Sequence, residues 1–463
     1  MAARKQDEVA REAHKQSLAF EHVATPHGWL SPGRLEVDAD GNLTDVRRAG
    51  PDACPDLRRG YALPAIPNLH SHAFQRAMAG HAERRSPDSA NDSFWTWRTA
   101  MYEVASTMKP DRLEVVATVL FNEMVASGTC SVAEFHYLHH EPYGAPAAPK
   151  TAYAESILRA AATTGIAVTL CPVLYLHGGF DRTLEEKQLR FGHRSVAAFA
   201  ELFEDLRQVV SRTPFAKLGL AFHSLRAVRP DEMHACIEAL GLQSEPDTPI
   251  HIHIAEQTAE VEACVHATGK RPLRLLLDEG LVDARTCLVH ATHLDASERE
   301  EATALAAVAG LCPTTEANLG DGIFELGAWL HAGGSIGIGS DSQICVDPLE
   351  ELRLLEYSQR LQQQRRCIAA SAAEPHVGAY LWRASVEGGA RALGQNIRGL
   401  AVGQRADFVV LDGDHPRLRD HGPETICDAA VFSRAGPPVI REVWRAGERL
   451  YARDLAAEHG TAR

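Results

Sequence analysis

Short apolar runs alternate with longer amphipathic segments between about residues 64 and 345. Most of the runs are separated by stretches with a helical spacing of apolar residues, such as 111–128 and 258–280. Repeated strand–helix units predict parallel strands, and eight of them predict a closed (β/α)8 barrel of the TIM type. The eight runs are PAIPNLHSH, CSVAEFHYLH, AVTLCPVLYLHGG, KLGLAFHSL, PIHIHIAEQ, TCLVHATHL, GLCPTTEANL and SIGIGSDSQ.

An open, doubly wound α/β sheet is the alternative fold for this alternation of elements. A dinucleotide-binding sheet of that kind carries a G-x-G-x-x-G turn after its first strand. No such turn follows the first apolar run of this chain. The pattern therefore favours the barrel.

The two flanks of the chain have a different pattern. Residues 18–62 and about 398–452 read as short strands broken by Gly, Pro and Asp-Gly turns. Neither flank is large enough to form a good core alone, so we expect them to pair into one small β-sandwich beside the barrel. The predicted organisation is an N-terminal part of the sandwich at 1–62, a barrel at 63–394 and a C-terminal part of the sandwich at 395–463.

Composition narrows the class of protein. The chain has 463 residues, of which 45% are hydrophobic and 23% charged, as in soluble globular proteins. Its net charge of −14 argues against nucleic-acid binding. No apolar run is long enough to cross a membrane, and the charged N-terminus does not resemble a signal peptide. Ten scattered cysteines without a CxxC pair indicate a reducing compartment, so we expect a cytoplasmic protein.

Polar residues gather at the carboxyl ends of the apolar runs. In a barrel these ends form one face, which is where active sites lie, so residues far apart in the sequence are predicted to converge there. These residues are His70, His72, His136, His223, His253, His290, Asn318 and Asp341.

Two histidine pairs suggest a metal centre. Side chains alternate along a strand, so His70 and His72 point to one face, and His251 and His253 also share a face. A single histidine at a strand end is more often an ordinary polar residue than a ligand, but the joint pattern is hard to obtain by chance. Three imidazoles and one carboxylate suit zinc and leave room for a water. The predicted ligands are His70, His72, His253 and Asp341.

Four motifs at these strand ends resemble the amidohydrolase superfamily, in its deaminase branch: NLHSH, HIHIAEQ, LVHATH and GIGSDS. The tail GLAVGQRADFVVLD is similar to the segment with which the superfamily returns to its sandwich. A second group of motifs narrows the resemblance to those members that deiminate N-formimino-L-glutamate. That group comprises HAFQRAMAG, DSFWTWR, EFHYLHH, FHSLRAV and CPTTEANLGDGIF.

The resemblance implies hydrolysis of N-formimino-L-glutamate to N-formyl-L-glutamate and ammonia in histidine degradation. A guanidino carboxylate or an aminopurine are the alternative substrates. We expect one metal per subunit, zinc or else iron, because two-metal members need a bridging carboxylated lysine and Lys217 lies at the wrong end of its strand. Such a metal generates hydroxide at neutral pH. The expected partners are a small substrate with carboxylates and a second copy of the chain, with no nucleic acid and no membrane.

The residue roles follow from this expectation. Asp341 would bind the metal and accept the proton of the water, His290 would orient the hydroxide, and Glu256 would pass protons to the leaving nitrogen. Planar guanidinium groups suit the two substrate carboxylates. Arg98 is placed on a long first loop and Arg226 just past the fourth strand. By resemblance the substrate contacts are Gln75, Arg98, Tyr137, His223 and Arg226.

Overall fold

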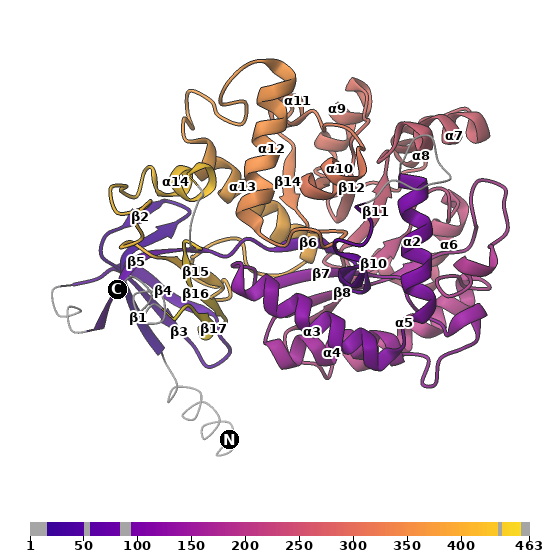
Figure 1. The fold of residues 1–463 in the computed structure, drawn as a ribbon, viewed down its shortest axis with the longest axis horizontal. Helices are drawn as coiled ribbons and strands as arrows, with labels where there is room; N and C mark the ends of the chain where they lie inside the picture. Colours follow the sequence, from indigo (N-terminus) through magenta and orange to yellow (C-terminus); the bar gives the residue numbers. More distant parts are fainter. Residues whose placement is uncertain (1–15, 51–55, 84–93, 434–437, 455–463) are drawn as a thin grey trace.

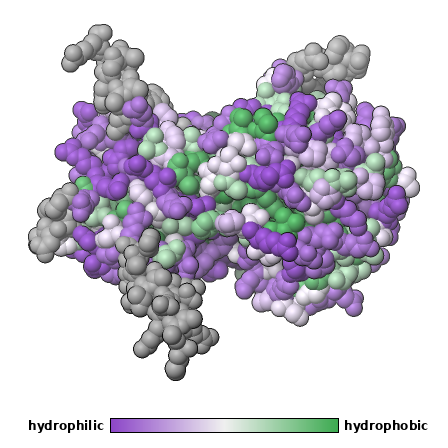
Figure 2. Space-filling view, turned by 90° about the horizontal axis from the view of Figure 1, so that it is seen from below, coloured by the Kyte–Doolittle hydropathy of each residue, from purple (hydrophilic) through white to green (hydrophobic). Residues whose placement is uncertain are grey.

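The structure is a computed structural model that describes residues 16–50, 56–83, 94–433 and 438–454. The first 15 residues of the predicted 1–62 segment and the last nine of the 395–463 segment lie outside these ranges, as does the part of the first loop at 84–93. Figure 1 shows a barrel with surrounding helices on one side and a separate, mostly antiparallel sheet on the other. The face seen in Figure 2 is mostly hydrophilic, with hydrophobic residues confined to small patches.

The barrel is closed by parallel strands, as the sequence predicts. Its hydrogen-bonded order is β6-β7-β8-β10-β11-β12-β13-β14, and β14 pairs with β6 to complete the ring. The strands are β6 (Asn68–Ser71), β7 (Ser131–His136), β8 (Ala167–Leu174), β9 (Ala216–Leu218), β10 (Leu220–Phe222), β11 (Ile250–Ile254), β12 (Thr286–His290), β13 (Val308–Leu311) and β14 (Ser335–Ile338).

The fourth apolar run forms two short strands instead of one. β9 pairs only with β8, whereas β10 pairs with both β8 and β11, and Gly219 separates them. A Cβ atom at residue 219 would lie 2.7 Å from Sγ of Cys171 and 3.1 Å from Cγ of Pro249. Neighbouring strands approach too closely for a side chain here, so the position requires glycine.

Helices connect the strands and cover the outside of the barrel (Figure 1). The segment expected to be helical at 258–280 is divided in two, because Gly269 adopts a left-handed φ of 77° and Pro272 begins the next helix. No helix in the described ranges is long and apolar enough to cross a membrane. The helices between and after the barrel strands are α2 (Phe94–Thr107), α3 (Pro110–Ala126), α4 (Ala152–Thr164), α5 (Val196–Val210), α6 (Pro230–Ala239), α7 (Thr258–Thr268), α8 (Pro272–Asp278), α9 (Ala296–Ala304), α10 (Pro313–Leu319), α11 (Leu326–His331), α12 (Pro348–Gln363) and α13 (Val377–Leu393). Short 3₁₀ helices occur at η2 (Ala73–Met78), η3 (Pro142–Gly144), η4 (Glu186–Gln188) and η5 (Leu242–Ser244).

The two flanks of the chain share one sheet. Its strand order is β17-β16-β15-β5-β1-β3-β4, with β2 paired to β1, so the C-terminal strands and the N-terminal strands form two blocks that meet where β15 pairs with β5. Phe20, Phe408 and Trp444 pack into a hydrophobic cluster of their own, separate from the barrel core. The strands are β1 (Gln16–Thr25), β2 (Gly28–Leu30), β3 (Gly33–Val37), β4 (Leu43–Arg48), β5 (Leu57–Pro64), β15 (Phe408–Leu411), β16 (Ile440–Arg445) and β17 (Glu448–Ala452). One helix, α14 (Ile426–Phe432), lies between β15 and β16 in the chain.

The end of α13 closes the amino-terminal mouth of the barrel. Ala390, Ala392 and Leu393 pack against side chains inside the barrel, including Leu69 and Val289. A helix ends with carbonyl groups that lack partners within the helix. Barrel side chains supply them here: His251 Nε2 lies 2.7 Å from the carbonyl oxygen of Ala392, Thr169 Oγ1 donates to Leu393, and Lys217 Nζ donates to Gly394. Lys217 therefore lies at the end of the barrel opposite the predicted metal ligands.

Gly388 permits the close packing of α13 against β14. A Cβ atom there would overlap the backbone carbonyl of Ile336, which cannot turn aside. We expect Gly388→Ala to lower the free energy of unfolding by about 1–3 kcal/mol through overpacking, measured by urea denaturation. Gly327→Ala in α11 is the matched control, because its Cβ would meet side-chain atoms and no backbone, with Cγ2 of Ile368 at 3.2 Å and Nε2 of Gln363 at 3.9 Å. Equal stability of the two variants would contradict this account of the packing.

Candidate active site

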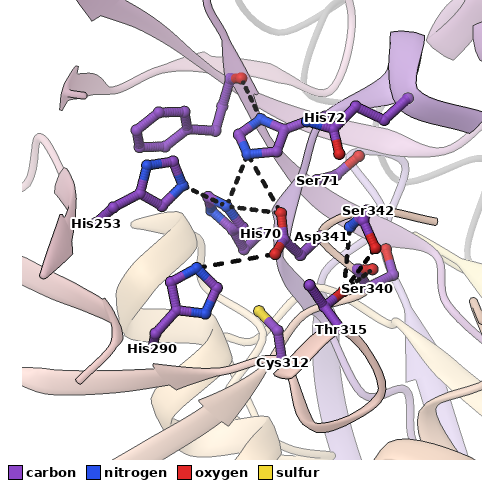
Figure 3. A network of polar contacts seen from close by, with 12 residues as sticks. His70, Ser71, His72, His253, His290, Cys312, Thr315, Ser340, Asp341 and Ser342 are labelled. Carbon is purple, nitrogen blue, oxygen red and sulfur yellow. Dashed lines mark hydrogen bonds and ion pairs between the residues drawn. The ribbon is translucent and has the colours of Figure 1, made fainter. Parts of the chain in front are cut away.

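The carboxyl ends of three barrel strands bring the predicted metal ligands together. His70 lies in β6 and His72 directly follows it, His253 lies in β11, and Asp341 follows β14. All four side chains are buried. Figure 3 shows the three imidazole rings and the carboxylate of Asp341 pointing toward one another, although they come from distant parts of the sequence.

The distances among these groups match the edges of a small tetrahedron. Nε2 of His70 lies 3.2 Å from Nε2 of His72 and 3.0 Å from Nε2 of His253. Oδ1 of Asp341 lies 3.5 Å from Nε2 of His70 and 3.3 Å from Nε2 of His72. Zinc bound tetrahedrally at 2.0–2.1 Å from each ligand would separate its ligands by about 3.3 Å.

The protonation of the rings shows that this cluster fits a cation. Nδ1 of His72 lies 3.0 Å from the carbonyl oxygen of Phe135, and Nδ1 of His253 lies 3.0 Å from that of His223. A carbonyl only accepts hydrogen bonds, so both Nδ1 atoms carry the proton. Burial lowers the pKa of His72 and of His253, and that of His70 to about 3, so the rings stay neutral. The Nε2 lone pairs of His72 and His253 then point at the same small space as a carboxylate, an arrangement that a metal ion stabilises.

Several backbone positions at this end of the barrel are strained. Ala255, His290, Ala291 and Asp341 all have left-handed φ angles, between 44° and 68°. Residues with a Cβ atom seldom adopt this conformation, and such positions gather at functional sites. Two of the four are themselves predicted site residues, and Ala255 directly precedes a third, Glu256. The backbone strain therefore coincides with the predicted chemistry.

Glu256 and His290 lie side by side next to the ligand cluster. Nε2 of His290 is 3.8 Å from Oε1 of Glu256 and 3.8 Å from Oδ2 of Asp341. Oε2 of Glu256 is 4.0 Å from Nη2 of Arg226. Burial raises the pKa of Glu256 to about 7. A carboxyl group with this pKa can both donate and accept a proton near neutral pH.

The charge of His290 depends on the acids around it. Burial acts to lower the pKa of its ring, but the carboxylates of Glu256, Glu316 and Asp341 outweigh this effect and raise the pKa to about 10. The surrounding carboxylates therefore stabilise positive charge at this ring.

A cavity of about 700 Å³ opens over these residues. Gln75 and Tyr137 meet in its wall, where Nε2 of Gln75 donates to the Tyr137 hydroxyl at 2.8 Å. Oε1 of Gln75 is buried and has no hydrogen-bond partner among the described residues, so it can accept a hydrogen bond from a ligand. All five predicted substrate contacts line the cavity: Gln75, Arg98, Tyr137, His223 and Arg226.

Arg98 lies on a helix and not on the loop that the sequence suggested. α2 contains it, because Met101, Ala105 and Met108 recur at helical spacing and are buried against the core. The Arg98 guanidinium lies 5.1 Å from the ring centre of Tyr102 and also forms a hydrogen bond with the side chain of Tyr175. Neither tyrosine could be predicted from the sequence, because no motif or spacing connects it with Arg98. Only the folded structure brings them together.

Two of the strand-end residues are not brought to the site. His136 ends β7 but packs beside His139, with ring centres 5.3 Å apart, and does not line the cavity. Asn318 lies on α10, exposed, where its amide donates to Glu83 at 2.6 Å. The CPTTEANLGDGIF motif instead contributes Glu316 and Asp321, which approach His290 and Glu256. Of this motif the sequence predicted only Asn318 at the site, and neither Glu316 nor Asp321.

The chain belongs to the amidohydrolase family, whose pattern it matches over residues 61–450. It is 45% identical over 453 residues to formimidoylglutamate deiminase of Pseudomonas aeruginosa, covering 96% of this chain and 97% of that protein. It is 26% identical over 457 residues to 8-oxoguanine deaminase of the same bacterium, with 95% and 96% covered.

The crystal structure of an amidohydrolase from Brucella melitensis has the same fold. Its TM-score is 0.86 at 42% identity, with 94% of each chain covered. These relatives confirm the predicted superfamily and the barrel. The chain is therefore a hydrolase that acts on carbon–nitrogen bonds.

Proposed function

We propose that this protein hydrolyses N-formimino-L-glutamate to N-formyl-L-glutamate and ammonia, as a step of histidine degradation. The observation that carries the proposal is the similarity, over nearly the whole chain, to a formimidoylglutamate deiminase. The cavity supports it, because two partly buried arginines, Arg98 and Arg226, face the space above the histidine cluster. The substrate has two carboxylates, and planar guanidinium groups bind carboxylates through paired hydrogen bonds.

We further propose that His70, His72, His253 and Asp341 hold one divalent metal ion, zinc in preference to iron. Zinc would act as a Lewis acid and lower the pKa of a bound water to about 7. Oδ2 of Asp341 faces His290 at 3.8 Å, away from the rings of His70 and His72, and is placed to accept a proton from the attacking water.

The other residues of the site handle the substrate and its protons. Glu256 carries a proton to the formimino nitrogen, which must leave as ammonia. Its pKa near 7 allows it first to accept this proton and then to donate it. His290 keeps the attacking oxygen in line with the formimino carbon. Tyr137 receives its hydrogen bond from Gln75, so its own hydroxyl proton is free to bind a substrate carboxylate. Burial, together with the charges of Arg226 and Arg98, lowers the pKa of His223 well below its ordinary value, so this ring acts as a neutral hydrogen-bonding group.

One experiment tests the substrate class. Ammonia release is measured with N-formimino-L-glutamate, N-formimino-L-aspartate, N-guanidino-L-glutamate and guanine, and the metal content of the same preparation is determined by mass spectrometry. We expect turnover to be fastest with N-formimino-L-glutamate and one metal ion per chain. Activity confined to guanine, or to the guanidino compound, would overturn the substrate assignment.

Arg226→Ala tests the carboxylate site. Loss of one charge-assisted hydrogen bond costs about 1.5–3 kcal/mol, so we expect kcat/KM to fall about 10- to 150-fold with the metal content unchanged. Arg229→Ala is the matched control, because Arg229 is exposed and pairs with Asp231 and Glu232 on the surface. A loss below about twofold for Arg226→Ala would place the anion site elsewhere.

We also propose that the protein is cytoplasmic and works as a homodimer on its small substrate, without nucleic acid or membrane. The nine cysteines among the described residues are all free, which supports a reducing compartment. Sedimentation analysis would distinguish a dimer from a monomer.

A further inference from the structure

A buried carboxylate stands behind His290, on the side away from the cavity. Oε1 of Glu316 lies 3.4 Å from Nδ1 of His290, while Nε2 of the same ring points toward Glu256 and Asp341. His290 and Glu316 are both almost completely buried. Glu316 does not line the cavity, so it cannot touch a substrate held there.

The carboxylate itself is fixed by its own surroundings. Glu316 belongs to α10, which starts directly after β13 and Cys312. The backbone N–H of Cys312 donates to the same oxygen, Oε1, at 2.9 Å. Because one oxygen is held by the backbone of the preceding turn, Glu316 offers His290 an acceptor in a set position.

We propose that Glu316 is a positioning residue that keeps the proton of His290 on Nδ1 and its Nε2 directed at the reacting groups. A carboxylate accepts a hydrogen bond and cannot donate one, so the proton between the two groups is on Nδ1 whether the ring is neutral or charged. The inference rests on the proposed function, since it concerns the residue expected to orient the attacking oxygen.

The backbone at His290 explains why such support is needed. The residue has a left-handed φ of 68° at the very end of β12, and Ala291 follows with a φ of 50°. This conformation is not favoured by the residue types present, so the surrounding contacts must hold it. Without Glu316 the ring can turn or shift its proton to Nε2, and either change removes the acceptor that faces the cavity.

The test is a set of variants at residue 316 with a double-mutant cycle. We expect Glu316→Ala to lower kcat for N-formimino-L-glutamate about 10- to 100-fold, as other partners that orient a functional histidine do, with KM changed less than twofold and metal content unchanged. Glu316→Gln keeps an oxygen that can accept from Nδ1 and should lose less. In a His290→Asn background, Glu316→Ala should cost less than twofold further, because the residue acts only through the ring.

Glu356→Gln is the control for loss of a buried carboxylate. Glu356 is fully buried and accepts from the backbone of Ile368 and Ala369, in a region away from the cavity. Its variant is expected to lose stability but to keep kcat. Losses at Glu316 that add fully to those of His290→Asn, or that appear mainly in KM, would overturn the positioning role.

A second measurement does not depend on turnover. In protein labelled with ¹⁵N at histidine, the ring signals missing from His290→Asn belong to His290. We expect a protonated Nδ1 in the wild type and a mixture of tautomers in Glu316→Ala; identical signals in both would contradict the inference. Failure of the proposed function would look different, because the wild type would then release no ammonia while the ring signals still changed.

Discussion

Replacing Glu256 with glutamine is expected to abolish most of the turnover while the protein keeps its metal. The amide has nearly the same shape as the carboxyl group, but it can neither give a proton to the leaving nitrogen nor take one back. Positioned proton transfer contributes about 10²- to 10⁴-fold to a rate, so kcat should fall by that amount. Steady-state ammonia release and metal analysis of the same sample measure the two quantities.

The matched control is Glu262→Gln on α7, because Glu262 is exposed and follows Glu256 by less than two helical turns. It should leave both kcat and metal content unchanged. If Glu256→Gln retains full activity, the proton must reach the nitrogen by another group, and Glu256 has no part in the chemistry. A variant that has lost its metal would leave the rate uninterpretable, so the metal content is determined before the kinetics.

Asp341→Asn is expected to lose both metal and activity. Among the described residues, its carboxylate is the one anion within 3.5 Å of Nε2 of both His70 and His72, so it supplies the negative charge of the ligand set. An amide oxygen is neutral and a weaker ligand, and an amide N–H turned inward would face the ring lone pairs. The loss in metal affinity should exceed the about 10- to 100-fold that follows removal of an outer hydrogen-bond partner.

Metal content after dialysis against buffer without metal gives the first readout, and kcat at increasing concentrations of added zinc gives the second. Asp347→Asn serves as the control, since Asp347 caps α12 by accepting from the backbone N–H of Leu349 at 2.9 Å and does not line the cavity. Wild-type metal content in Asp341→Asn would mean that the three histidines suffice, and that the carboxylate acts on the water alone.

The barrel could be predicted because its signal is repeated and local. Every run of apolar residues except the fourth becomes a single strand. Parallel strands in a closed ring place their carboxyl ends on one face, so His70, His253 and Asp341 converge as expected. The break at Gly219 and the division of the 258–280 segment at Pro272 are less visible, because they depend on how closely neighbouring elements approach.

The outer parts of the site could not be predicted, for a different reason. Tyr175 and Glu316 act through neighbours in space, Arg98 and His290, and no spacing along the chain connects the members of either pair. Arg98 lies on α2, although the sequence predicts a loop there; Met101 and Ala105 follow it at helical spacing. The left-handed backbone at His290 and Asp341 leaves no mark in the sequence, since neither residue is glycine.

The shared sheet has a consequence for synthesis of the chain. One edge of β5 pairs with β1 soon after both strands leave the ribosome. Its other edge stays unpaired until β15, one of the last strands, has been synthesised. An uncovered strand edge readily pairs with other chains. The nascent protein should therefore depend on chaperones until its final strands emerge, and a premature stop codon before Phe408 should yield aggregates even though every predicted metal ligand has already been translated.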